Sequence, residues 1–191
     1  MTRRFGTERT ALLLLFWLTI LTGVVYPLSI TGVAQALFPV QANGSLIDVG
    51  GVLVGSALVG QANDDPRYFW PRSSATGYNA LPSGATNLGP TSGALAAAVA
   101  ARAAALRRAH NLPPDAPIPA DMLFASASGL DPHINPAAAQ MQIERVARAR
   151  NLPAGKLAAL VAQFTERPQL GLLGQPRVNV LLLNLALDEV E

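Results

Sequence analysis

The chain has 191 residues, a formal net charge of +2 and no cysteine, and 50% of its residues are hydrophobic. The lack of cysteine excludes disulfides, thiolate metal ligands and a cysteine nucleophile. The charged residues form no cluster that would suit nucleic acid, so we expect no nucleic-acid partner. The length is sufficient for one membrane segment and one domain with its own core.

A membrane-spanning helix is expected over residues 11–31. The run from Ala11 to Ile30 contains no charged residue. At about 1.5 Å rise per residue, a run of this length crosses the roughly 30 Å hydrocarbon core of a bilayer. A cleaved signal peptide is the alternative, but its apolar region would be shorter, and the bulky Tyr26-Pro27-Leu28 lies where a cleavage site needs small residues. We therefore expect a retained anchor.

The flanking charges orient this helix. Three arginines lie within residues 1–10, and the next basic residue is Arg67. The positive-inside rule places residues 1–10 in the cytoplasm. Residues 32–191 are then expected to form one soluble domain outside the cytoplasm, attached to the inner (plasma) membrane by a single pass.

The second half of the span contains small and hydroxyl-bearing residues. Glycine permits close approach of two helices, and threonine can hydrogen-bond across them. A partner helix is therefore expected to pack against Thr19, Thr22 and Gly23.

Beyond the span, the pattern predicts two short strands and a long loop. Leu46–Val49 and Val52–Val59 are apolar runs on either side of Gly50-Gly51, which suits a hairpin. The stretch Gln61–Gly93 is rich in Pro, Gly, Asn and Ser, has no helical or strand period, and carries several aromatic residues. Loops of this length inside compact domains usually bind something or are disordered, and the aromatic residues argue against disorder.

The remainder predicts three helices and weaker elements. Helices are expected over Gly93–Ala109, from Asn135-Pro136 to Asn151, and through Leu157 to a stop near Arg167-Pro168. In the second helix an apolar stripe is expected to face the core, formed by Ala139, Ile143, Val146 and Ala147.

Two further segments are short or ambiguous. Met122–Ala125 is expected to be a short strand. Residues 177–191 are compatible with a strand or with a helix capped by Asn179, and we favour the helix. Together the elements predict an α+β fold.

No strong catalytic motif is present. Ser126, Ser128, Asp131 and His133 contain the residue types of a serine hydrolase but lie outside any G-x-S-x-G elbow, so we expect a structural or binding role. The two histidines have no ligand spacing, so no metal site is expected. His110, near a helix C-terminus, suits the role of a favourable partner of the helix dipole.

The glycine-rich run before the first domain helix also lacks a complete motif. Gly84–Gly93 lacks the G-K-[ST] ending of a phosphate-binding loop. The residues thus favour an anchored interaction subunit over an enzyme. The alternative is a membrane-anchored extracytoplasmic hydrolase that uses Ser128 or Ser126 with His133.

Short motifs along nearly the whole chain resemble one bacterial family. The sequence is similar to the C chain of the Kdp potassium-transporting ATPase, and it departs at Ser73 and Ala85, where the family usually has proline and often has glycine. The segments that carry the resemblance are Tyr26-Pro27-Leu28, Gln35–Pro39, Gln41–Leu46, Gly55-Ser56, Gly60-Gln61, Tyr68-Phe69, Arg72, Tyr78-Asn79, Ser83-Gly84, Thr86–Pro90, Ser126–Pro136, Thr165-Glu166, Pro176–Val180 and Asn184–Asp188.

The resemblance implies a small, non-catalytic accessory subunit of an ATP-driven, high-affinity potassium importer. Its expected partners are the channel-like A chain and the P-type ATPase B chain, which would handle potassium and ATP themselves, so no cofactor is expected here. The family is described as an assembly factor and as a catalytic chaperone that raises the ATP affinity of the B chain. Because the domain is expected outside the cytoplasm, this effect should be indirect.

Two surfaces are expected to contact the partners. One is the span. The other is the loop from Tyr68 to Pro90 together with Ser128 to His133. The candidate contact residues are Thr19, Thr22, Gly23, Tyr68, Phe69, Arg72, Tyr78, Asn79, Asn87, Ser128, Asp131 and His133.

Overall fold

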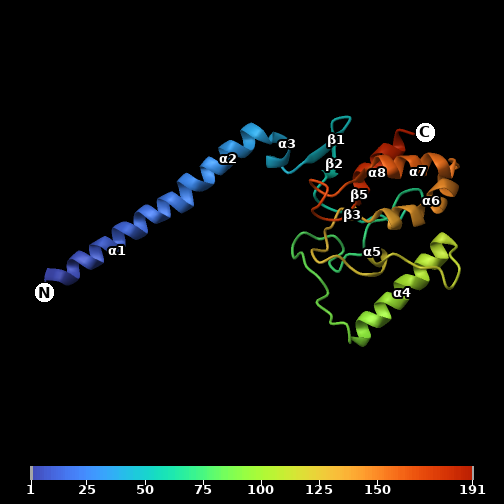
Figure 1. The fold of residues 1–191 in the computed structure, drawn as a ribbon, viewed down its shortest axis with the longest axis horizontal. Helices are drawn as coiled ribbons and strands as arrows, with labels where there is room; N and C mark the ends of the chain where they lie inside the picture. Colours follow the sequence, from blue (N-terminus) through green and yellow to red (C-terminus); the bar gives the residue numbers. More distant parts are fainter. Residues whose placement is uncertain (1, 191) are drawn as a thin grey trace. The chain divides into compact units, whose positions relative to one another are not determined.

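The computed structural model describes residues 2–190. Its contacts divide the chain into two compact units, Met1–Val54 and Gly55–Glu191, which we describe separately. Both can be followed in the ribbon drawing (Figure 1).

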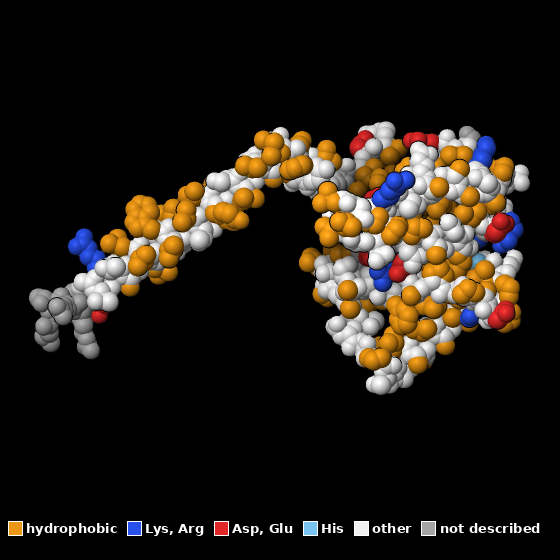
Figure 2. Space-filling model, in the orientation of Figure 1, with side chains coloured by type: hydrophobic (Ala, Val, Ile, Leu, Met, Phe, Trp, Pro, Cys, Tyr) orange, Lys and Arg blue, Asp and Glu red, His pale blue; other side chains and the backbone are white. Residues whose placement is uncertain are grey.

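The first unit is dominated by one long helix. It consists of α1 (Thr2–Ile20), the π-helical segment η1 (Leu21–Val25) and α2 (Tyr26–Leu37), which follow one another without a break. Among the described residues, one helix, Gly6–Leu37, is long and apolar enough to cross a membrane, and nothing in the chain buries its apolar window. Hydrophobic side chains recur along its visible face (Figure 2).

The π-helical segment lies directly before a proline. The backbone N–H of Tyr26 donates to Leu21 O, five residues back instead of four. Pro27 has no N–H to offer to the preceding turn, and a local change of hydrogen-bond register is a common way for a helix to adjust to it. The span thus contains one wider turn near its middle.

A short helix and a hairpin complete the connection to the second unit. Helix α3 (Pro39–Ala42) follows, and β1 (Leu46–Val49) then pairs with β2 (Val52–Ser56) in a two-stranded sheet. Gly50 and Gly51 both have positive φ, as the tight turn requires. The predicted hairpin is therefore confirmed.

The second unit contains five helices among its described residues. They are α4 (Gly93–His110), α5 (Ala120–Leu123), α6 (Pro136–Arg150), α7 (Ala154–Gln163) and α8 (Val180–Asp188).

Side chains fix the ends of the longer helices. Ser92, Asn135 and Asn179 cap α4, α6 and α8 by accepting a hydrogen bond from the backbone three residues on. Asn111 and Asn151 end α4 and α6 in the left-handed conformation. The predicted caps at Asn135 and Asn179 and the stop at Asn151 are confirmed.

A small antiparallel sheet joins segments far apart in the chain. Its strands are β3 (His133–Ile134), β4 (Thr165–Glu166) and β5 (Arg177–Asn179), in the order β3-β5-β4. His133 is opposite Asn179, and Thr165 is opposite Val178. The α+β class is confirmed.

The core of the second unit lies between α6, α7, α8 and β5. All four residues of the predicted stripe on α6 are buried, and Leu183 and Leu187 of α8 are completely inaccessible. Phe69 of the long loop is the largest side chain with no exposed surface.

Two local predictions were wrong, and a third was right in part. Met122 belongs to helix α5 instead of a strand, because Pro119 begins a helical turn and a run of four apolar residues is too short to show a period. The third helix ends at Gln163, short of Arg167-Pro168, since Thr165 enters β4. Residues 177–179 form a strand before Asn179 caps the helix, so both readings of this segment apply in part.

Candidate functional site

Two amide side chains hold the aromatic loop against the domain. The N–H of Phe69 donates to Asn184 Oδ1 at 2.8 Å, and Asn184 Nδ2 donates back to Phe69 O at 2.9 Å. Gln142 makes the same pair of bonds with the backbone of Trp70, at 2.7 and 3.1 Å. The buried amides thereby provide hydrogen-bond partners for the N–H and C=O groups of the loop backbone, as a neighbouring strand would.

A buried arginine completes this attachment. Arg145 of α6 donates to Pro66 O at 2.6 Å and to Tyr68 O at 2.9 Å, and its guanidinium lies 4.0 Å from the centre of the Trp70 ring. Burial lowers the pKa of Arg145 to about 10, so it stays charged at neutral pH. Its charge is stabilised by carbonyl and ring dipoles.

His110 is a buried acceptor for this arginine. Arg145 Nε donates to His110 Nε2 at 3.1 Å, while His110 Nδ1 lies 3.0 Å from Leu106 O. Burial lowers the pKa of His110, and the charges of Arg145 and Arg148 lower it further, although the contact with Leu106 O opposes them. His110 is thus the last residue of α4 and pairs with a carbonyl of its final turn, and the lowered pKa favours the neutral imidazole.

A polar cluster links the loop to the small sheet. Arg72 Nη1 bonds to Asp131 Oδ2 at 2.9 Å, and the ring of His133 lies between two carboxylates, 3.6 Å from Asp131 and 3.9 Å from Glu166. Burial alone would raise the pKa of Asp131, but hydrogen bonds from His133 and Arg72 outweigh it and lower the pKa. Asp131 is therefore a stable anion.

Backbone bonds join the two loop segments of the predicted contact surface. Gly84 N donates to Ser128 O at 2.9 Å, and Ser126 N donates to Ser73 O at 3.1 Å. A Cβ at Gly129 would lie 2.7 Å from Thr76 Oγ1 and 3.0 Å from Gly84 O, so only glycine fits between the segments. The two segments thus form one surface.

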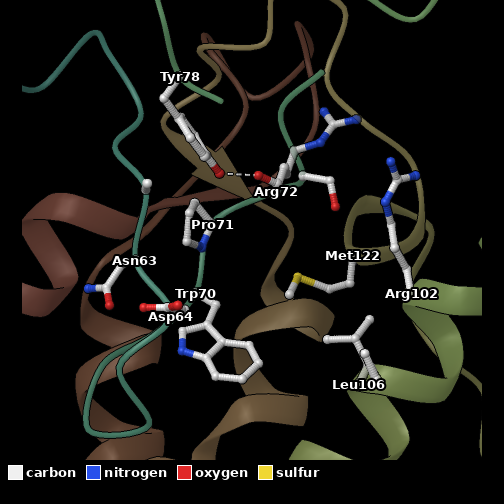
Figure 3. A pocket seen from close by; sticks show the side chains of 12 residues that line it. Asn63, Asp64, Trp70, Pro71, Arg72, Tyr78, Arg102, Leu106 and Met122 are labelled. Carbon is white, nitrogen blue, oxygen red and sulfur yellow. Dashed lines mark hydrogen bonds between the residues drawn. The ribbon is translucent and has the colours of Figure 1, made fainter. Parts of the chain in front are cut away.

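A cleft lies between this loop and α4 (Figure 3). It has a volume of about 420 Å³, with Trp70, Leu106 and Met122 on its apolar wall and Asp64 and Arg102 among its polar residues. The Tyr78 hydroxyl donates to Arg72 O above it. Burial, and to a smaller extent the charge of Asp131, raise the pKa of Tyr78 to about 12, so the hydroxyl keeps its proton.

The candidate contact residues differ in accessibility. Asn79, Asn87 and Ser128 are exposed, while Phe69 is buried completely. Phe69 therefore fixes the loop from inside, and its side chain has no surface to offer a partner. The partly exposed candidates are Tyr68, Arg72, Tyr78, Asp131 and His133.

In the span, Thr22 bonds within its own helix. Its hydroxyl donates to Leu18 O at 2.7 Å. Among the residues that the structure describes, nothing lies within 4 Å of a Cβ built on Gly23. Contacts of Thr19, Thr22 and Gly23 with a partner helix remain predictions.

The hydrolase alternative is not favoured. Ser128 Oγ accepts from Leu130 N, and both ring nitrogens of His133 face carboxylates, with Nε2 toward Glu166. A serine nucleophile needs that nitrogen as its base. In the part of the chain that the structure describes, no group of three or more His, Cys, Asp or Glu could hold a metal ion.

Sequence reasoning missed the residues that position the loop. Gln142, Arg145 and Asn184 are polar residues on otherwise apolar helix faces, and their placement beside buried neighbours was the available signal. Buried polar groups need hydrogen-bond partners. A polar residue on an apolar helix face therefore predicts that a backbone segment packs there and bonds to it.

Comparisons with known proteins agree over almost the full chain. The family model described as "KdpC: K+-transporting ATPase, c chain" matches residues 8–189. A relative from Polaromonas naphthalenivorans is 59% identical over 187 residues, covering 96% of this chain and 94% of its own length. Relatives from Rhodospirillum rubrum (57% identical, 96% of this chain and 95% of its own) and Ralstonia nicotianae (52% identical, 97% and 92%) are similar throughout as well.

All three relatives carry the name "Potassium-transporting ATPase KdpC subunit". The match covers the apolar helix, the aromatic loop and the small sheet together. The chain belongs to the C-chain (KdpC) family of potassium-transporting ATPase subunits.

Proposed function

We propose that this chain is a non-catalytic accessory subunit that holds the channel-like A chain and the P-type ATPase B chain in one complex. The observation that carries the proposal is the helix Gly6–Leu37, whose apolar window has no partner within the described chain. A helix that is apolar on all sides requires lipid or other helices around it. The family supplies two membrane-embedded partners for it.

The proposed topology is a cytoplasmic N-terminus, a single pass through the inner membrane and an extracytoplasmic second unit. The arginines of residues 1–10 and the absence of further basic residues before Arg67 support it. In this topology the Gly84–Gly93 loop cannot touch cytosolic ATP. A higher ATP affinity of the B chain would then arise through the span and the partner subunits.

A reporter fused after the last residue tests the topology. An alkaline phosphatase fusion, active only outside the cytoplasm, should be active, and a green fluorescent protein fusion, which folds in the cytoplasm, should be dark. The opposite pattern would overturn the topology and make direct contact with nucleotide the leading explanation.

Substitution of Gly23 tests the assembly role. Gly23→Leu adds bulk where the chain itself has open space, so the isolated subunit should remain inserted and folded. If a partner helix packs there, co-purification with tagged B chain should fall several-fold, and the KM for ATP of the remaining complex should rise. Val24→Leu is the matched control, because it changes bulk at an already large residue. Equal recovery of both variants would contradict contact at Gly23.

A further inference from the structure

An exposed group of leucines lies in the turn between β4 and β5. We call residues 168–175 the leucine loop. Leu170, Leu172 and Leu173 are 91%, 86% and 61% exposed, although each is a large apolar side chain. Exposed apolar groups of this kind mark surfaces that another apolar phase covers.

Hydrogen bonds within the loop backbone hold these leucines on the surface of the second unit. Gln169 N donates to Leu173 O at 2.8 Å, and Leu172 N and Leu173 N both donate to Gln169 O, at 3.1 and 2.9 Å. Leu170 has a φ of +54°, which is unfavourable for a residue with a side chain, and Gly171 follows at +73°. The loop is therefore an ordered turn that presents its leucines in a strained conformation.

The charges beside the loop are two arginines and one glutamate. Arg167 directly precedes the loop and is exposed, and Arg177 follows Pro176 just beyond it. Arg177 is paired with Glu166 at 2.8 Å, whereas the segment between the two arginines contains no acidic residue. Basic residues beside exposed apolar ones suit an anionic phospholipid surface.

A hydrogen bond joins the end of β5, which follows the loop, to the first residues of the second unit. Asn179 at the end of β5 donates to Ala57 O at 2.7 Å. From Asn179 back to Leu173 the chain can span at most about 20 Å. The leucine loop is therefore linked, within the second unit, to residues that closely follow Gly55.

We infer that the leucine loop is a second membrane contact, in which Leu170, Leu172 and Leu173 insert into the headgroup–acyl boundary of an anionic phospholipid bilayer. The two flanking arginines lie at the level of the phosphates. This inference rests on the proposed membrane anchoring, and it adds a lipid-binding site on the second unit. The anchor and the loop together would restrict how the domain tilts on the membrane.

Single-cysteine labelling tests the inference, because the chain has no cysteine of its own. The full chain is placed in nanodiscs of phosphatidylglycerol and phosphatidylethanolamine, with an environment-sensitive fluorophore at Leu172→Cys, at Ala101→Cys or at Leu21→Cys. Ala101 is an exposed residue of α4 and serves as the control. Leu21 lies in the long helix and reports the anchor. Brominated lipids are the quencher.

The label at Leu172→Cys should be quenched several-fold more strongly than the label at Ala101→Cys, and less strongly in nanodiscs of phosphatidylcholine alone. Leu170→Asn should reduce the quenching, since asparagine tolerates the left-handed conformation but is polar. Quenching at Leu21→Cys without quenching at Leu172→Cys would overturn the inference while leaving the anchor intact. No quenching at Leu21→Cys would overturn the anchor and the inference together.

The same labels in the assembled complex separate lipid from protein. If Leu172→Cys becomes shielded from water only when the A and B chains are present, and brominated lipid does not quench it, the leucines contact a partner subunit and the inference is wrong. Continued quenching by lipid in the complex supports it.

Discussion

The two units differ in which side chains they expose and which they bury. The long helix leaves Leu12 to Leu15, Phe16 and Trp17 about half exposed or more, whereas the second unit encloses an apolar core and also buries Arg145 and His110. The first arrangement is stable only where lipid or other helices replace water. The second depends on hydrogen-bond partners for its buried polar side chains, such as the carbonyls of Pro66 and Tyr68 around Arg145. The contrast indicates that the first unit needs surroundings to cover its apolar side chains, whereas the second has a core of its own.

The largest expected effect comes from making the long helix resemble a water-facing one. Leu18→Arg with Leu21→Arg should cost about 6 kcal/mol of insertion free energy, because each arginine near the centre of a span costs about 3 kcal/mol. The chain should then disappear from membranes washed with alkaline carbonate. Leu18→Val with Leu21→Val is the control and should stay. Retention of the double arginine variant would show that the helix is not an anchor.

Loss of the loop's buried aromatic residue should have the next largest effect. Phe69→Ala should lower the free energy of unfolding by about 3–5 kcal/mol, because it empties a fully buried site. The measurement is urea unfolding of the full chain in detergent, followed by Trp70 fluorescence. Tyr68→Ala, at a partly exposed neighbour, should cost much less. Equal losses would mean that Phe69 does not hold the loop.

The buried arginine offers a sharper test of the second unit. Arg145→Met keeps the apolar stem but removes the donors to Pro66 O and Tyr68 O. Leaving buried acceptors unpaired should cost about 2–4 kcal/mol in the same unfolding experiment. Arg148→Met on the exposed side of α6 should change stability by less than about 0.5 kcal/mol. If both variants behave alike, the carbonyl contacts contribute nothing measurable.

The smallest expected effect is on pH dependence. His110 has a lowered pKa in the folded state, so the unfolded chain binds the extra proton first as the pH falls below the ordinary value of 6.5. Stability should therefore be complete above pH 6.5 and decline below it, by at most about 1.4 kcal/mol per pH unit for one proton. Asp131 adds to this loss only below its ordinary value of 3.8, because its pKa is also lowered.

His110→Gln supplies the control for that titration. Glutamine can still accept from Arg145 but does not protonate. The decline between pH 6.5 and 4.5 should be weaker in this variant, as measured by thermal unfolding across the range. An unchanged decline would assign the acid sensitivity to another group.

The sequence was sufficient for features that depend on local chemistry. The apolar run, the Gly50-Gly51 hairpin and the caps at Asn135 and Asn179 follow from rules that act within a few residues. The predictions failed where distant segments decide the outcome. Met122 lies in a helical turn, and its buried side chain packs in the domain core. Thr165, which was expected in a helix, pairs with Val178 in the small sheet instead.

The candidate surface was predictable as a region but not in its details. The length and aromatic content of the loop indicated that it is ordered, and the structure joins it to the Ser126–His133 segment. Asn184 bonds to the backbone of Phe69 and so helps to turn its side chain inward. Gln142 and Arg145 hold Trp70 in place. These partners lie more than 70 residues away in sequence, so polar positions on the helix faces could indicate that they hold backbone but not which segment they hold.

The wider turn at Leu21–Val25 changes which side chains of the long helix share a face. One turn of a π-helix accommodates an extra residue, which offsets the downstream half by about 100° relative to a uniform α-helix. A helical wheel drawn through Gly6–Leu37 with a constant 3.6-residue period would therefore align the wrong positions of α1 and α2. A neighbouring helix that follows one stripe of α1 meets a different stripe of α2, so the two halves of the span can present separate faces to separate neighbours.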